Sequence, residues 1–382
     1  MTTAAAFGLP EAVTYITART PGFMRPTAVK AAILLTVAGV AATAAVWLSL
    51  VWLSRGDASL GRLIAVASLA ITPQLLVGLL RGMAAGLELW TLVATERVFS
   101  SGLRVLALIP FWLNGTLSPL VATVILAAMP LIGAASYVRL IGRAPAKEPG
   151  TVIPPTWGDL TGFGGRLWIG SISGIILLRL DQSLMTPLTG SYQLGLYVVA
   201  VSVSELPLVV NVAIRDVTFA SAAAGAADDR LAMSARISGT LTFLVALGVG
   251  GSMFYWLPPL FGAGFRGSLP VAVVLLVGVV VSTPGSIGGA GLSGRGRPGL
   301  RSIGLLIACV VNVALLLALV PSMGALGAAY ATLAGSVIAQ NMNLVFLWRI
   351  YGMPMHSFYG FRRQDAREVS RLIRRLLPGR LR

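Results

Sequence analysis

Long apolar runs separated by short polar connections dominate this sequence. Most runs are about twenty residues long, the length that an α-helix needs to cross the hydrocarbon core of a bilayer. Backbone groups in lipid must be paired within their own segment, so the runs predict helices rather than the alternating strands of a β-barrel. About eleven spans are predicted, at about Thr3–Ala18, Ala31–Leu53, Leu63–Leu87, Ser100–Trp112, Leu117–Leu140, Leu167–Leu188, Leu194–Ile214, Thr240–Leu260, Leu269–Ala290, Ile303–Val320 and Leu326–Leu347.

The longest polar interruption, Gly142–Phe163, is rich in proline and divides the chain into two halves. It predicts a linker between an N-terminal helical bundle at residues 1–141 and a six-helix bundle at residues 164–350. Paired helical bundles are typical of transporters that are built from repeats. We therefore predict an all-α polytopic membrane protein with two bundles.

Composition supports the membrane assignment. Of the 382 residues, 56% are hydrophobic and 11% are charged, whereas soluble domains carry about a quarter charged residues. The net charge of +16 does not indicate nucleic-acid binding, because the basic residues lie at the ends of apolar runs rather than on one soluble face.

The basic residues alternate between the connections. Those after the first, third, fifth, seventh and ninth predicted spans are rich in Arg and Lys, and the others contain few. The positive-inside rule then places the rich connections and the C-terminus in the cytoplasm of a multi-pass cytoplasmic-membrane protein. By the same rule Met1 lies outside, and the first segment enters the membrane without a preceding charge. This pattern suggests that an initial helix is missing.

The C-terminal segment, residues 351–382, differs from the spans. Arginine is frequent in it, and five apolar residues fall on one helical face, namely Val369, Leu372, Ile373, Leu376 and Leu377. The spacing predicts a basic amphipathic helix on the anionic cytoplasmic leaflet. A solvated, disordered tail is the alternative.

Arg179 and Asp181 lie deep inside a predicted span, where each charge needs a partner or water. Their two-residue offset puts them on different helical faces. The next span offers Glu205, followed by Pro207, which removes a backbone donor and loosens the helix. Two opposed helices joined by a short turn would bring Arg179 and Glu205 to a similar depth. Two interpretations stay open, a structural ion pair or a site for substrate or a coupling ion.

Three further residues complete the predicted set of substrate-binding or gating residues. Glu11, in the first segment, faces either a central cavity or the interface. Gln74 follows Pro73 within a span, next to an expected helix break. Arg81 lies toward the cytoplasmic end of that span, where anchoring the helix is favoured over contact with an anionic head group.

No motif for catalysis or metal binding stands out. The glycine-rich stretch Gly288–Arg297 lacks the core of a phosphate loop and predicts a tight cytoplasmic turn. The single histidine, His356, lies in the tail, and the single cysteine is Cys309, so no metal site is expected in the bundle. Asp228–Asp229 predicts a solvated turn. We expect no enzyme activity and no cofactor.

Several segments resemble a known family. Arg179–Gln182, Leu188–Tyr197 and Glu205–Pro207 resemble the seventh and eighth helices of polysaccharide flippases of the multidrug/oligosaccharidyl-lipid/polysaccharide exporter superfamily. Segments similar to the second helix, an outer-loop turn and the last common helix of this family are Gly8–Tyr15, Leu260–Phe265 and Gly324–Ala331.

The resemblance implies a twelve- or fourteen-helix fold in two lobes, with the first helix absent from this sequence. It implies a flippase that moves a polyprenyl-diphosphate-linked oligosaccharide by alternating access, with membrane lipids and polysaccharide assembly proteins as partners. Arg179 and Arg81 would bind the diphosphate. The alternatives are an ion-coupled small-molecule or drug antiporter of the same fold, and a non-transporting scaffold of polysaccharide assembly.

Overall fold

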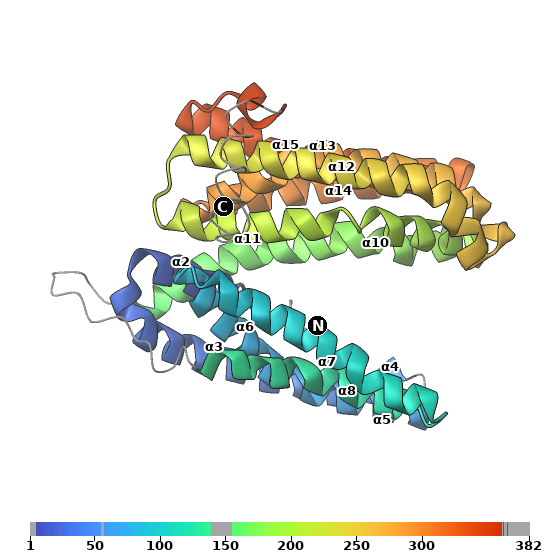
Figure 1. Cartoon of the computed structure of the whole chain (residues 1–382), viewed down its shortest axis with the longest axis horizontal. Coiled ribbons are helices and arrows are strands. Elements are labelled where there is room, and N and C mark those ends of the chain that lie inside the picture. Colours follow the sequence, from blue (N-terminus) through green and yellow to red (C-terminus); the bar gives the residue numbers. More distant parts are fainter. Residues whose placement is uncertain (1–4, 55–56, 139–154, 361, 363–364, 366–382) are drawn as a thin grey trace, which may run out of the picture. The chain divides into compact units, whose positions relative to one another are not determined.

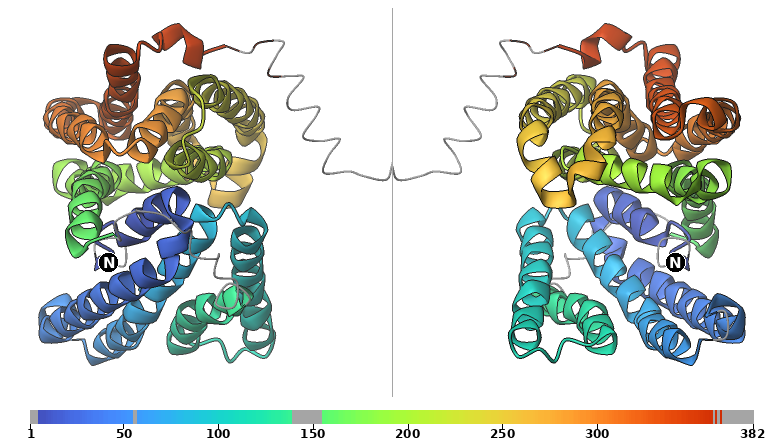
Figure 2. Two further views of the ribbon diagram at one scale, coloured as in Figure 1. Left: turned by 90° about the vertical axis from the view of Figure 1, so that its left-hand side faces the viewer. Right: turned by 90° about the vertical axis from the view of Figure 1, so that its right-hand side faces the viewer.

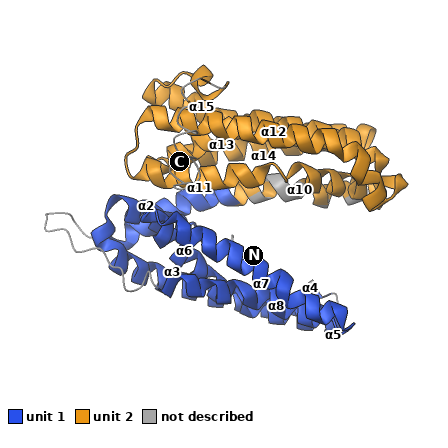
Figure 3. Ribbon diagram, viewed as in Figure 1, with its two compact units in different colours: residues 1–171 blue, residues 172–382 orange. Residues whose placement is uncertain are grey.

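The computed structural model describes residues 5–54, 57–138, 155–360, 362 and 365, and these residues contain helices but no strand (Figure 1). The chain forms two compact units, unit 1 at residues 1–171 and unit 2 at residues 172–382 (Figure 3). The side chains of residues 53, 175, 177–180, 183 and 186 lie outside the described part.

Six described helices are long and apolar enough to cross a membrane, or up to seven when the bent pair Pro187–Ser204 and Leu208–Ala223 counts as one. This confirms the predicted all-α polytopic class. Every predicted span overlaps a described helix, but the number of described helices that are long and apolar enough to cross a membrane is lower than the predicted number of spans. The helix at Leu9–Arg19 has only 11 residues, and the helix at Trp90–Leu113 contains Glu96, Arg97 and Arg104.

Unit 1 consists of short and long helices that run side by side (Figure 2). They are α2 (Leu9–Arg19), α3 (Met24–Leu48), α4 (Leu50–Leu53), α5 (Ala58–Leu69), α6 (Ile71–Gly86), α7 (Trp90–Leu113) and α8 (Pro119–Gly133), with the 3₁₀ turns η1 (Pro21–Phe23) and η2 (Ala134–Tyr137) and the first part of α10 (Trp157–Ser204).

The contact between α2 and α6 depends on a glycine stripe. Gly78, Gly82 and Gly86 lie four residues apart on α6 and face α2. A Cβ on Gly82 would lie 2.4 Å from the carbonyl oxygen of Pro10, so only glycine permits this approach. The Thr14 hydroxyl donates a hydrogen bond of 3.1 Å to the Gly82 carbonyl. Small residues of this spacing are typical of tightly packed membrane helices.

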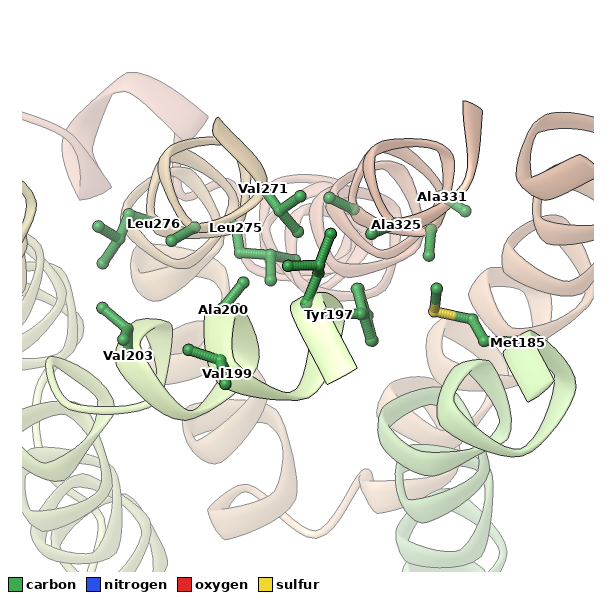
Figure 4. Packing of buried hydrophobic residues seen from close by; sticks show 14 of the residues in the cluster. Met185, Tyr197, Val199, Ala200, Val203, Val271, Leu275, Leu276, Ala325 and Ala331 are labelled. Atoms are coloured by element: carbon green, nitrogen blue, oxygen red, sulfur yellow. The ribbon is translucent and has the colours of Figure 1, made fainter. Parts of the chain in front are cut away.

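Unit 2 contains the longer helices. They are the rest of α10 (Trp157–Ser204), α11 (Leu208–Ala223), α12 (Asp228–Phe261), α13 (Ser268–Gly294), α14 (Pro298–Met323) and α15 (Ala325–Tyr351), with the 3₁₀ turns η3 (Ala263–Gly267) and η4 (Met355–Phe358). Their core contains Met185, Tyr197, Leu275 and Ala325, which point toward one another from α10, α13 and α15 (Figure 4).

Two predicted boundaries are wrong. The helix α7 begins at Trp90, well before the predicted Ser100, because buried Glu96 is paired with Arg81 and is therefore tolerated inside the helix. The glycine-rich stretch is not a turn over most of its length, since α13 continues to Gly294. Its glycines let α13 pack closely. A Cβ on Gly291 would lie 2.5 Å from a Leu231 methyl carbon.

The polar linker is also shorter than predicted, since α10 begins at Trp157, inside the expected Gly142–Phe163 segment. The predicted solvated turn at Asp228–Asp229 is also not found. Asp228 is the first residue of α12 and forms an ion pair with Arg295 at 2.5 Å. The rest of the linker up to residue 154 and the predicted amphipathic helix in the tail lie outside the described residues.

Candidate functional site

A cavity of about 280 Å³ lies within unit 2, between α10, α11, α13 and α15. Its walls contain two acidic side chains, Asp181 and Glu205, and one basic side chain, Arg215. Placing a charged side chain at the centre of a membrane helix costs about 2.5–3.5 kcal/mol of insertion free energy, so charged residues inside membrane bundles are rare and usually functional. Amide and hydroxyl groups complete the polar lining, namely those of Asn211, Gln340, Tyr197, Ser204, Thr332, Ser282, Thr283, Ser286 and Ser336.

Asp181 is the most enclosed of these three residues, with only 2% of its surface exposed. The Tyr197 hydroxyl donates a hydrogen bond to Oδ2 of Asp181. The Thr332 hydroxyl donates to the same oxygen at 3.3 Å and lies 2.8 Å from the Tyr197 hydroxyl. The Gln182 backbone N–H donates to Oδ1 at 2.6 Å. The carboxylate therefore joins two parts of α10 through the Tyr197 hydroxyl, and it joins α10 to α15 through the Thr332 hydroxyl.

A kink in α10 brings Asp181 and Tyr197 together. The two residues lie on either side of Gly190, whose φ of 84° and ψ of 173° are not helical. A positive φ of this size favours glycine, because a Cβ would be strained there. Nothing lies within 4 Å of the position that a Cβ on Gly190 would take, so the backbone conformation rather than close packing requires glycine.

The span that follows the kink is broken at Glu205–Pro207. The axes of its two halves, Pro187–Ser204 and Leu208–Ala223, differ by 53°. Pro207 has no backbone N–H, which explains why α10 ends just before it and α11 begins just after it. Glu205 lines the cavity at this break and is exposed. Discontinuous helices of this kind line substrate and ion sites in transporters.

A second polar cluster fixes the helices on another side of the cavity. Asn211 is 3% exposed and donates a hydrogen bond of 3.2 Å from Nδ2 to the Ser238 hydroxyl. The Ser286 hydroxyl donates to Oδ1 of Asn211, also at 3.2 Å. Asn211 therefore connects α11 to α12 and α13. Its packing role is the ordinary one for a polar residue in a membrane bundle.

The structure brings two of the predicted site residues together, since Asp181 and Glu205 line one cavity. Arg179 lies on α10, and its side chain is outside the described part. Glu11 is exposed on α2, and Gln74 is half-buried on α6. The helix break expected beside Gln74 is found at Ala70, between α5 and α6.

Arg81 forms an ion pair with Glu96, which is 2% exposed. Its Nε and Nη2 donate two hydrogen bonds of 3.0 Å to the carboxylate. Ser100 and Tyr137 donate to the same carboxylate at 3.3 and 3.4 Å. Arg81 thus links α6 to α7 and η2 within unit 1, and the Arg81 side chain remains 36% exposed.

The sequence interpretation missed Tyr197, Thr332 and Glu96. Tyr197 and Thr332 look like ordinary residues of an apolar span, and only the kink at Gly190 and the packing of α15 bring them to Asp181. For Glu96 a signal existed, because Ser100 follows it by one helical turn and Arg81 lies on the preceding span.

The cluster of carboxylate and hydroxyl oxygens around Asp181 suits a proton or a monovalent cation. A calcium site takes six to eight oxygen ligands at about 2.3–2.6 Å, many more than this cluster offers. In the part of the chain that the structure describes, no group of three or more His, Cys, Asp or Glu residues could hold a metal ion.

No protein-family model and no curated protein matches this sequence. Solved structures do match. A multidrug resistance MATE family transporter of the MOP superfamily, in its outward-facing conformation, is 17% identical, covers 92% of this chain and 85% of its own, and has a TM-score of 0.72. The inward-facing conformation covers 92% and 88%, with 17% identity and a TM-score of 0.67.

A third match is a MOP superfamily transporter from Pyrococcus furiosus, described as having a binding pocket of reverse polarity that suggests a different function. It is 15% identical, covers 90% of this chain and 83% of its own, and has a TM-score of 0.72. At these identities the likeness establishes the fold and no more. Both units therefore have the fold of MOP superfamily transporters.

Proposed function

We propose that this chain is a membrane transporter that works by alternating access, and that Asp181 binds its coupling cation or proton. The observation that carries the proposal is a buried carboxylate, held by two hydroxyl groups, in the wall of a membrane cavity. An ionisable residue inside a membrane bundle is a functional candidate by default, since burying it without a task lowers stability. Asp181 has such a position.

The fold supports alternating access. Structures described as outward-facing and inward-facing both match this chain over 92% of its length. In transporters of this general kind, substrate sites lie at broken helices near the bilayer midplane, and parts of the bundle rock around them. The break at Glu205–Pro207, beside the cavity, is a feature of that kind.

We propose a polyprenyl-diphosphate-linked oligosaccharide as the substrate. The resemblance of Arg179–Gln182 and Glu205–Pro207 to polysaccharide flippases supports this choice. The lining of the cavity supports it as well, because amide and hydroxyl groups suit the hydroxyls of a sugar. The positively charged Arg215 lies at the wall of the cavity and suits an anionic group of such a substrate.

The second candidate function is an ion-coupled antiporter of drugs or other small molecules. The multidrug transporters among the matching structures favour it. A third possibility is a scaffold of polysaccharide assembly that transports nothing, but this function would not explain why the carboxylate of Asp181 is buried.

Transport by the purified protein in lipid vesicles distinguishes the candidates. A flippase moves a lipid-linked oligosaccharide between leaflets and leaves cationic dyes where they are. A drug antiporter expels such dyes against a cation gradient and does not accelerate oligosaccharide flipping. If the protein showed neither of these activities under a sodium or a proton gradient, the result would contradict the proposed transport function.

A further inference from the structure

A groove on unit 2 lies between α12 and α13, outside the polar cavity. Its volume is about 400 Å³, and all its lining residues are apolar. The floor contains Ala246 and Leu276, which are 6% and 5% exposed. The rim consists of exposed side chains at positions four residues apart on each helix, namely Phe243, Leu247, Val273, Val277 and Val281.

Two glycines of α12 leave space in this groove because they have no side chain. Gly250 and Gly251 both line it. A Cβ on Gly250 would meet a Leu276 methyl carbon at 3.3 Å, whereas a Cβ on Gly251 would meet nothing within 4 Å. The open space beside Gly251 is therefore part of the groove, and a longer side chain at Gly251 would extend into it without a backbone clash.

We propose that this groove binds an acyl chain of a bilayer phospholipid. Both walls are helices long and apolar enough to cross a membrane, so hydrocarbon is the medium that surrounds them. Water is a poor occupant, because cavities lined only by aliphatic and aromatic groups stay dry. An empty groove would leave its lining without dispersion partners. The acyl chain supplies those contacts.

The groove is long and shallow. From Phe243 to Gly251 it follows α12 for about 12 Å, at about 1.5 Å per residue. A flexible acyl chain can lie along both walls over this length and contact the floor at Ala246 and Leu276. A helix of a second copy of this chain is the other occupant that an apolar groove could take, and the test below distinguishes it by the oligomeric state.

Binding would depend on the chain and not on the head group, since none of the lining residues is charged or polar. Phosphatidylglycerol and phosphatidylethanolamine with identical acyl chains should therefore bind equally. The proposal is independent of the transported substrate, because the groove contains none of the residues of the polar cavity.

The test is native mass spectrometry of delipidated protein to which one of these phospholipids is added. Gly251→Leu fills the groove and should weaken binding of the first lipid roughly tenfold, the equivalent of about two methylene groups losing apolar contact. Gly248→Leu is the matched control. It adds the same side chain to the same helix, also in open space, at a position that does not line the groove.

Val277→Phe, at the exposed rim, is a second variant that narrows the groove in case Gly251→Leu does not fold. Weaker binding in these variants, with Gly248→Leu like the wild type, supports the proposal. Equal binding by the Leu variants at positions 251 and 248 would overturn it. Three other results would also overturn the proposal. They are a strong preference of the protein for one head group, binding of an isoprenoid lipid but of neither phospholipid, and a dimer of the wild type that Gly251→Leu dissociates.

Discussion

Tyr197 and Asp181 form a hydrogen bond across the kink of α10, and Thr332 donates to the same carboxylate oxygen at 3.3 Å. Tyr197→Phe removes one donor and keeps the aromatic ring in the core. Because the carboxylate is buried, we expect a loss of about 1–3 kcal/mol of stability and slower transport. Thermal unfolding and transport in vesicles measure the two effects. Tyr255→Phe, on an exposed tyrosine of α12, should change neither stability nor transport.

The buried ion pair between Arg236 and Asp365 should hold the segment after α15 on α12. Arg236 donates to both carboxylate oxygens at 2.6 and 2.7 Å and to the Ser357 carbonyl at 2.7 Å. Asp365→Asn leaves a buried guanidinium without its counter-charge, so we expect a loss of about 3–5 kcal/mol. Asp229→Asn, on an exposed carboxylate at the start of α12, is the control and should lose under about 0.5 kcal/mol.

The same pair gives a pH dependence. The hydrogen bond from Arg236 lowers the pKa of Asp365 below its ordinary value. A carboxyl group with a lowered pKa in the folded state stabilises the fold above its unfolded pKa of about 3.9, and this stabilisation is lost as the pH falls through the lower, folded-state pKa. The stability difference between wild type and Asp365→Asn should therefore shrink below about pH 4. A difference that stays constant from pH 7 to pH 3 would contradict the assignment.

Arg81 and Glu96 should respond unequally to mutation. Arg81→Gln leaves Glu96 buried without its cation, whereas Glu96→Gln leaves Arg81, whose side chain is already 36% exposed, without its partner. We expect a loss of about 3 kcal/mol from the first change and about 1 kcal/mol from the second. Denaturation of the two single variants and the double variant measures the coupling. Equal losses from the two single changes would show that burial of Glu96 does not matter.

The glycine stripe of α6 predicts a steric effect. Gly82→Ala puts a Cβ 2.4 Å from the Pro10 carbonyl oxygen and should destabilise unit 1 by about 1–3 kcal/mol. Gly102→Ala on α7 is the matched control, because nothing lies within 4 Å of its Cβ. That change should stabilise the helix by about 0.5–1 kcal/mol. Thermal unfolding should move in opposite directions, and a shift in the same direction would contradict the close contact of α2 with α6.

Much of the fold could be predicted from the sequence, because lipid leaves apolar runs of this length only one conformation. The break at Glu205–Pro207 was also predictable, since Pro207 cannot donate a helical hydrogen bond. The end of α13 was not, because a run of glycines signals a turn in water but permits close helix packing in a bundle, as at Gly291.

The site was predictable only in part. Asp181 and Glu205 stand out as charges in apolar segments, and the structure places both on one cavity. Tyr197 and Thr332 carry no such signal, because their role depends on the fold rather than on their neighbours in sequence. Glu96 was hidden for the opposite reason, since a charge beside Arg97 looks like a polar connection until Arg81 is seen to neutralise it.

The most direct test of the proposed function is transport by Asp181→Asn, which keeps the size of the side chain and removes its charge. The measurement is gradient-driven transport in vesicles with the substrate that the wild type accepts, at matched protein abundance. Asp181→Asn should lose at least about tenfold in rate, the equivalent of about 1.4 kcal/mol in the barrier, while Asp229→Asn should match the wild type. Equal rates for Asp181→Asn and Asp229→Asn would contradict the assignment of Asp181 as the coupling residue.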